Sequence, residues 1–248
     1  MQTKLVKIGF EIEGEFDNLA HRWLSTKGEM KGDGSLRSCS SSDHNEDIPL
    51  AVGEYNSPVY SATPTGLKTI KKFFDELDAL QKSHRFHFNS TCGFHIHVSF
   101  NQFPAECFSK QFVNFFLKAL KTKQKRVIEK RSDNRFCQLR VPASEIENRN
   151  HGERYRFVNL WPAYQRHGTI EFRIYPTDDP KRMYRYIVFT LGQVRAFLKS
   201  NLKAKSKIKI NFGDYQTSNL TQECALTSRE DIYTGVARPT INNEEYTF

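Results

Sequence analysis

The sequence predicts an α+β domain in which helices pack on one face of an antiparallel sheet. Three segments alternate apolar and polar residues, a pattern typical of β-strands because successive side chains point to opposite faces. Three further segments carry apolar residues at helical spacing, as expected for helices that cover such a sheet. The alternating segments are residues 4–16 (KLVKIGFEIEGEF), 92–100 (CGFHIHVSF) and 168–176 (GTIEFRIYP).

The first alternating segment presents a row of carboxylates. Its apolar residues share one parity, whereas Glu11, Glu13 and Glu15 share the other. Carboxylates two residues apart on one face lie about 7 Å from each other, and their repulsion favours a cation above the strand. The apolar residues are Val6, Ile8, Phe10, Ile12 and Phe16.

The other two alternating segments also carry ligand-type residues on one parity. If the three strands join one sheet, their apolar faces form the core and their polar faces merge into one floor. The alternative is an ordinary solvent-exposed face, where charged residues alternate for solubility alone. The presence of ligand-type residues on all three strands favours the floor. These polar positions are His95, His97 and Ser99 in one segment and Glu171, Arg173 and Tyr175 in the other.

Three helices are predicted on the apolar side of the sheet. Thr63 or Thr65 can cap a helix that runs to about Ser83. A second helix begins near Pro104, a residue favoured in the first turn, and a third follows Pro180. Their apolar stripes are Leu67, Ile70, Phe73, Phe74, Leu77 and Leu80; Phe108, Phe112, Phe115, Phe116 and Leu120; and Met183, Ile187, Leu191, Val194 and Leu198.

Shorter segments between these elements add candidate ligands. Residues 31–36 (KGDGSL) have the composition of a tight turn, in which Asp33 either offers a ligand or bonds its own backbone. Residues 52–60 read as a short extended segment with Glu54 on its polar side. We find no internal repeat or linker, so residues 1–248 are predicted to form a single domain, with no role assigned to the tail from about residue 201.

Composition narrows the class of protein. The chain has 248 residues, of which 38% are hydrophobic and 13% aromatic, and this favours a folded globular protein. No apolar run reaches membrane-spanning length. Five cysteines without a CxxC pair argue against a disulfide framework and a structural zinc site, and favour a cytoplasmic location.

The charge balance favours an acidic partner. The net charge of +9 suits nucleotide phosphates, a polyanionic substrate or nucleic acid. Much of the excess lies in residues 121–131 and 199–209, which could equally be solvated helix ends.

The predicted floor suits a hard divalent cation. Several carboxylates with one imidazole favour Mg²⁺ or Mn²⁺ over zinc, and His95 with His97 alone is a weak zinc signal. Arg173 can stabilise a transferred phosphoryl group beside such an ion. The sequence contains neither a P-loop nor a dinucleotide-binding GxGxxG. These features together predict phosphoryl-transfer chemistry.

Six motifs in order resemble the amidoligase family of the carboxylate–amine ligase superfamily, which includes glutamine synthetase and γ-glutamylcysteine synthetase. They are GFEIEGEF, GDGSL, EYNSP, GFHIHVSF, YRFVNL and TIEFRIY, and they lie between residues 4 and 176. The resemblance implies a curved, mainly antiparallel sheet of glutamine synthetase type. Its concave polar face would hold ATP and about two or three Mg²⁺ ions, with Mn²⁺ as an alternative, and helices would pack behind it.

The resemblance also implies roles for individual residues. Arg173 would neutralise the transferred phosphate and would be catalytic together with Glu54 and Glu171. Glu46 or Asp47 could take the place of Glu54. The implied metal ligands are Glu11, Glu13, Asp33, Glu54, His95 and Glu171, and the implied nucleotide or substrate contacts are Arg173, His97, Arg156 and Asn159.

The implied function is ATP- and Mg²⁺-dependent ligation of a carboxylate to an amine through an acyl phosphate. The acceptor could be an acidic peptide or polymer. One alternative is an amide hydrolase that uses the same site. Another is a non-catalytic nucleic-acid-binding protein that uses the basic runs, although the aromatic residues lie in core stripes rather than among the lysines.

Overall fold

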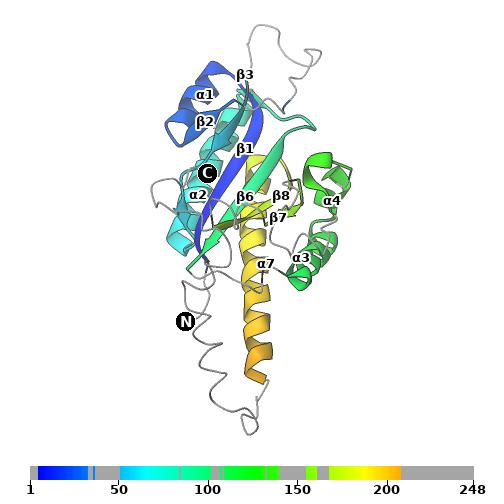
Figure 1. The fold of residues 1–248 in the computed structure, drawn as a ribbon. Helices are drawn as coiled ribbons and strands as arrows, with labels where there is room; N and C mark the ends of the chain where they lie inside the picture. Colours follow the sequence, from blue (N-terminus) through cyan, green and yellow to red (C-terminus); the bar gives the residue numbers. More distant parts are fainter. Residues whose placement is uncertain are drawn as a thin grey trace, which may run out of the picture.

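The structure, a computed structural model, describes residues 5–32, 36, 51–83, 85–101, 107, 109–131, 133–139, 155–160 and 168–207. In this part of the chain, eight antiparallel strands form one sheet, which confirms the α+β prediction (Figure 1). The strands are β1 (Leu5–Phe16), β2 (Glu29–Lys31), β3 (Ala51–Asn56), β4 (Tyr60–Ser61), β5 (Phe86–His87), β6 (Gly93–Phe100), β7 (Val158–Asn159) and β8 (Thr169–Pro176).

The strand order brings the three predicted segments together in the middle of the sheet. The order is β2-β3-β1-β6-β8-β7, and β4 and β5 pair with the two ends of β1. β1 therefore lies between β3 and β6, and β6 lies between β1 and β8. Strands far apart in sequence thus place their side chains in neighbouring columns.

The helices begin at side-chain caps or at proline. Thr63 accepts a hydrogen bond from the Gly66 amide at 3.2 Å, and Ser109 accepts one from the Phe112 amide at the same distance. The helices are α1 (Asn18–Ser25), α2 (Pro64–Lys82), α3 (Lys110–Lys123), α4 (Lys125–Arg131) and α7 (Pro180–Lys207), and η2 (Arg135–Cys137) is a short 3₁₀ helix. None of the described helices is long and apolar enough to cross a membrane.

Two of the three predicted helices are confirmed, and the start of the other is wrong. α2 and α7 lie where the apolar stripes predicted them. α3 begins at Lys110 instead of near Pro104, because the Ser109 hydroxyl supplies the acceptor that caps its first turn. Pro104 and Phe108 lie outside the described residues.

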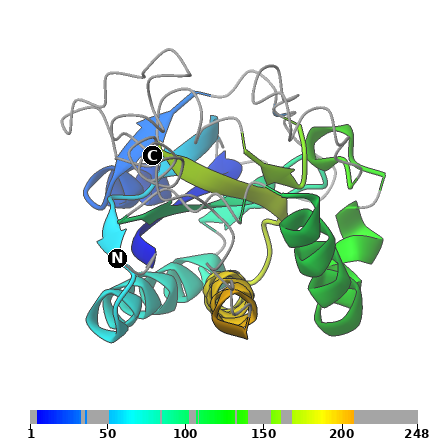
Figure 2. The ribbon, with the colours of Figure 1, turned by 60° about the horizontal axis from the view of Figure 1, so that its bottom comes forward.

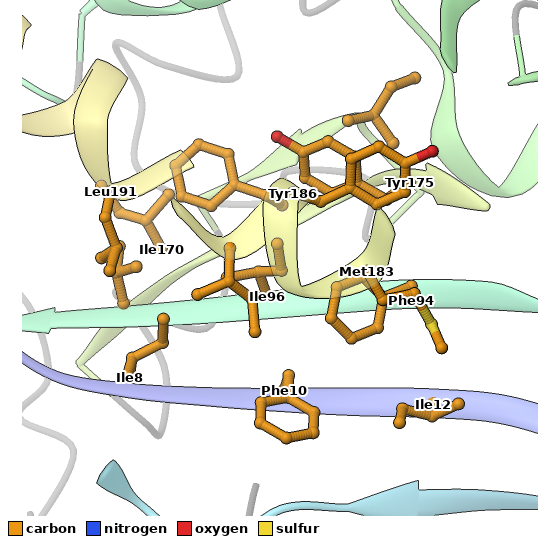
Figure 3. Close-up of a cluster of buried hydrophobic side chains, with 14 of the residues drawn as sticks. Ile8, Phe10, Ile12, Phe94, Ile96, Ile170, Tyr175, Met183, Tyr186 and Leu191 are labelled. Atoms are coloured by element: carbon orange, nitrogen blue, oxygen red, sulfur yellow. The ribbon is translucent and has the colours of Figure 1, made fainter. Parts of the chain in front are cut away.

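Helices α2, α3 and α7 cover the apolar side of the sheet, as predicted (Figure 2). The fully buried ring of Phe10 lies 5.4 Å from that of Phe73 and 5.1 Å from that of Phe74, measured between centroids. Figure 3 shows apolar side chains of β1 and β6 facing Met183 and Leu191 of α7. The aromatic stripes of the sequence therefore form core.

The alternation predicted for residues 168–176 fails at Tyr175. The pairing of β6 with β8 shifts between Phe94, which lies opposite Tyr175, and Ile96, which lies opposite Phe172. The extra β8 residue reverses the parity. The Tyr175 hydroxyl consequently lies 2.6 Å from the Thr190 hydroxyl of α7, on the helix side (Figure 3).

Much of the polar face of the sheet is also buried. Glu13, His95, His97, Glu171 and Arg173 are each at most 7% exposed. Part of the cover comes from η2, where the carbonyl of Phe136 accepts a hydrogen bond from Arg173 Nε at 3.4 Å. An ordinary solvent-exposed face is therefore excluded for these positions.

Truncation of Phe10 should test the aromatic core. Phe10→Ala removes a fully buried ring and should lower the free energy of unfolding by about 3–5 kcal/mol. Urea denaturation measures the effect. Leu19→Ala, at a side chain that is 51% exposed, should change stability by less than about 0.5 kcal/mol. A loss below about 1 kcal/mol for Phe10→Ala would contradict this description of the core.

Candidate functional site

The strand register places the polar residues in rows across the sheet. Glu11 of β1 lies opposite His95 of β6. His97, two residues further along β6, lies opposite Glu171 of β8, and Glu171 lies opposite Asn159 of β7. On the other side of β1, Glu54 of β3 lies opposite Glu13. The floor predicted from alternation is therefore one continuous cluster.

The carboxylate of Glu11 contacts two imidazoles at once. Its Oε2 lies 2.7 Å from His95 Nδ1, and its Oε1 lies 3.0 Å from His97 Nε2. Burial alone would raise the pKa of Glu11, but His97 and His95 hold it well below its ordinary value. Burial alone would lower the pKa of His97, whereas the Glu11 carboxylate raises it. Glu11 therefore stays ionised at the centre of the cluster.

Glu171 is held on both of its oxygens. Oε2 accepts a hydrogen bond from Asn159 Nδ2 at 2.6 Å, and Oε1 accepts one from Arg173 Nη1 at 2.5 Å. Burial would raise the pKa of this carboxyl, but Arg173 and His97 lower it. Oε1 also lies 3.5 Å from His95 Nδ1, so the two carboxylates face the same imidazole.

Two groups of three side chains could each hold a metal ion. In each group, one ligand atom per residue lies within 4.8 Å of the others. One group is Glu11, His97 and Glu171; the other is Glu11, Glu54 and His95. Each offers two carboxylates and one imidazole, a donor set that suits Mg²⁺ or Mn²⁺. Because Glu11 belongs to both, the geometry fits two neighbouring ions that share one carboxylate.

The pKa of Glu54 is raised because this carboxyl is buried close to other carboxylates. Burial and, to a smaller extent, the neighbouring Glu11 carboxylate together raise its pKa to about 7. Asn56 Nδ2 donates a hydrogen bond to its Oε1 at 2.9 Å, which only partly offsets the effect. A cation in the second group would remove this repulsion, since it favours the ionised form.

The structure brings most of the predicted metal ligands together. Glu11, Glu54, His95 and Glu171 belong to the candidate groups. Glu13 lies beside them, with Oε1 3.5 Å from His95 Nε2, but belongs to neither group. Asp33, Glu46 and Asp47 lie outside the described residues.

The predicted nucleotide or substrate contacts fall in three different places. His97 lies within a candidate metal group beside Glu11, and Asn159 and Arg173 hold Glu171. Arg156 donates a hydrogen bond to the side chain of Gln138, which lies just beyond η2. The roles of these four residues stay predictions.

The sequence analysis missed Arg131, which it placed within a basic run of solvated type. Lys125 and Arg126 of that run are indeed exposed, with 81% and 50% of their side chains accessible. Arg131 is 3% exposed, and its Nη1 donates a hydrogen bond to the carbonyl of Cys92 at 3.1 Å. One signal was available: Arg131 follows the buried Val127 by four residues and so shares its helix face.

The family model described as "Putative amidoligase enzyme" matches residues 32–149. This range includes the strands that carry Glu54, His95 and His97, while β1 and β8 lie on either side of it. Neither the comparison with curated proteins nor that with solved structures found a match. The match supports the family resemblance of the motifs.

Gly93 should tolerate no side chain. A Cβ added there would lie 2.8 Å from His95 Nε2 and 3.0 Å from Glu13 Oε2. Gly93→Ala should therefore lower the free energy of unfolding by about 1–3 kcal/mol, as measured by urea denaturation. Gly192→Ala in α7 is the matched control, because a Cβ there meets nothing within 4 Å, and it should be neutral or stabilising. Equal effects of the two substitutions would contradict this packing.

Glu54 should make the metal-free protein less stable at high pH. Its folded pKa of about 7 lies above its ordinary value of 4.5, so the folded state binds the proton more tightly than the unfolded state. The stabilisation of the folded state by this proton is fully present below about pH 4.5 and is lost as the pH rises through 7.

Glu54→Gln removes this dependence and should stabilise the protein by about 1–3 kcal/mol at pH 8. At pH 5 it should have little effect. Urea denaturation in EDTA at both pH values provides the measurement. A variant that is less stable than the wild type at pH 8 would show that the Glu54 carboxylate is compensated in the metal-free protein.

Proposed function

The match over residues 32–149 supports assigning this chain to the amidoligase family, and on that premise we propose that it is an ATP- and Mg²⁺-dependent ligase that joins a carboxylate to an amine. A carboxylate oxygen attacks the γ-phosphorus of ATP, and the bond to the leaving ADP breaks. The resulting acyl phosphate is attacked by the amine nitrogen at its carbonyl carbon. Phosphate then leaves, and the amine loses a proton to give the amide.

The observation that carries this proposal is the partly buried carboxylate of Glu11, shared by two candidate metal groups beside Arg173. Mg²⁺ bound by Glu11, Glu54, His95, His97 and Glu171 would neutralise the repulsion between the substrate carboxylate and the triphosphate. The side chains themselves fix the geometry, because they project from adjacent strands and hydrogen-bond one another. Such preorganised groups lower the barrier without reorganising during the reaction.

Arg173 is proposed to bind the transferred phosphoryl group. The residue is 7% exposed. Burial would lower the pKa of its guanidinium, but Glu171 raises it, so the group remains charged. A fixed guanidinium stabilises the charge on the oxygens of a phosphoryl group during transfer. Nη1 and Nε are held by Glu171 and by the carbonyl of Phe136, which fix the plane of the group.

The burial of the floor supports synthesis through a reactive intermediate. An acyl phosphate hydrolyses if water reaches it, and a site that excludes water protects it. Five residues of the floor are each at most 7% exposed, namely Glu13, His95, His97, Glu171 and Arg173. The same burial strengthens each electrostatic contact, because the local dielectric is lower than that of water.

The first experiment measures ADP and phosphate release from Mg·ATP by the purified protein with pooled amino acids, polyamines and peptides. The wild type should release ADP only when a pool supplies both substrates. Arg173→Ala and Glu11→Gln should reduce the rate roughly 10²–10³-fold, since each removes a preorganised charge. Arg126→Ala, at an exposed arginine of α4, is the matched control and should retain the wild-type rate.

The same assay discriminates the alternatives. Cleavage of an amide without stoichiometric ADP formation would indicate an amide hydrolase. If the wild type neither releases ADP with any pool nor binds ATP in a Mg²⁺-dependent manner, the ligase proposal fails. Salt-dependent binding of nucleic acid would then become the leading alternative.

A further inference from the structure

Arg131 is a buried arginine whose charge is incompletely satisfied. It is the last residue of α4, and its side chain is 3% exposed. Nη1 donates to the carbonyl of Cys92 at 3.1 Å, whereas Nε is buried and has no hydrogen-bond partner among the described residues. A buried donor left in this way costs about 1–3 kcal/mol. Such a donor calls for an explanation, and a ligand that accepts its hydrogen bond provides one.

The guanidinium of Arg131 takes part in the floor of the candidate site. An added Cβ at Gly93 would lie 3.2 Å from Arg131 Nη2, 3.0 Å from Glu13 Oε2 and 2.8 Å from His95 Nε2. The three side chains therefore converge on the one position where β6 presents no side chain of its own. The positive charge beside Gly93 therefore comes from α4, through Arg131, and not from β6.

The unpartnered Nε of Arg131 lies on an edge of the guanidinium that could bind a ligand. Nε and Nη2 lie on the edge opposite the Nη1–Cys92 hydrogen bond, and their N–H groups point in parallel. Among the described residues, the buried Nε has no hydrogen-bond partner, while Nη1 donates to the carbonyl of Cys92. Two parallel donors at this spacing match the two oxygens of a carboxylate.

We propose that Arg131 binds the carboxylate of the acid substrate, and this assignment rests on the proposed ligase function. The two arginines of the floor have different surroundings. Arg173 donates hydrogen bonds to Glu171 and to the carbonyl of Phe136, whereas the guanidinium of Arg131 donates to the carbonyl of Cys92 and lies near Gly93. A substrate carboxylate on Arg131 and a phosphoryl group near Arg173 would then flank the shared carboxylate of Glu11.

A purely structural role for Arg131 makes a different prediction. Its hydrogen bond to Cys92 ties α4 to the start of β6, and this tie needs only one N–H group. Arg131→Lys keeps the positive charge and one donor but loses the parallel pair. A structural arginine would therefore lose stability on substitution without any selective loss of carboxylate binding.

The experiment measures direct binding of acetate, glutarate and inorganic phosphate to the full-length protein with Mg²⁺ and without ATP. Ligand-observed NMR follows each probe. Arg131→Lys and Arg131→Met should weaken acetate and glutarate binding at least tenfold and change phosphate binding less than twofold. Arg126→Met, which changes an exposed arginine of the same helix, should bind all three probes as the wild type does.

Several outcomes would overturn the proposal. One is an Arg131→Lys variant that binds both carboxylates like the wild type, once circular dichroism and thermal unfolding show that it is folded. Selective loss of phosphate binding would move Arg131 to the phosphoryl end, and absence of carboxylate binding by the wild type would also count against it. If Arg131→Met does not fold, Arg131→Lys alone decides.

This test is independent of the ligase assay, because no step of it requires ATP or turnover. If the wild type releases no ADP but Arg131→Lys weakens carboxylate binding, the assignment of Arg131 stands and the ligase function is refuted. If the wild type releases ADP but Arg131→Lys binds carboxylates as the wild type does, the ligase function stands and the assignment of Arg131 is refuted.

Discussion

The double contact of the Glu11 carboxylate with two buried imidazoles is the interaction on which the site depends. It fixes His95 and His97 relative to β1, and through them it fixes the column of side chains on β8. Buried charges persist only when they are paired. The arrangement accommodates several carboxylates in a small volume because imidazoles, Asn159 and Arg173 surround them.

The charged groups of the site are not all equally stabilised by their neighbours, and this difference is consistent with a site that binds charged ligands. Glu11 and Glu171 have lowered pKa values, whereas burial raises that of Glu54 to about 7. Among the residues that the structure describes, Nε of Arg131 has no hydrogen-bond partner. The cluster therefore contains one carboxylate whose ionised form a cation would favour and one guanidinium with an unpartnered N–H group. Both conditions are expected of a site built for charged substrates.

The range that matches the family model contains only part of the candidate site, and the fold brings the remaining residues next to it. The matched range includes β3 and β6, whereas Glu11 and Glu171 lie on strands before and after it. The sheet order places β1 between β3 and β6, and β8 on the far side of β6. The site therefore rests on four adjacent strands backed by the apolar core, and rigid strands hold side chains more precisely than loops do.

The sequence by itself determined the faces of β1 and β6, the positions of α2 and α7, and the residue types of the floor. These features follow from the fixed geometry of the local backbone, in which side chains alternate along a strand and recur along a helix. Only the tertiary structure decided that the polar face is buried, that Tyr175 turns toward α7 and that Arg131 enters the floor. Each of these depends on a partner element, since a bulge is defined by the neighbouring strand and burial by the segments packed above. A local pattern contains no information about either.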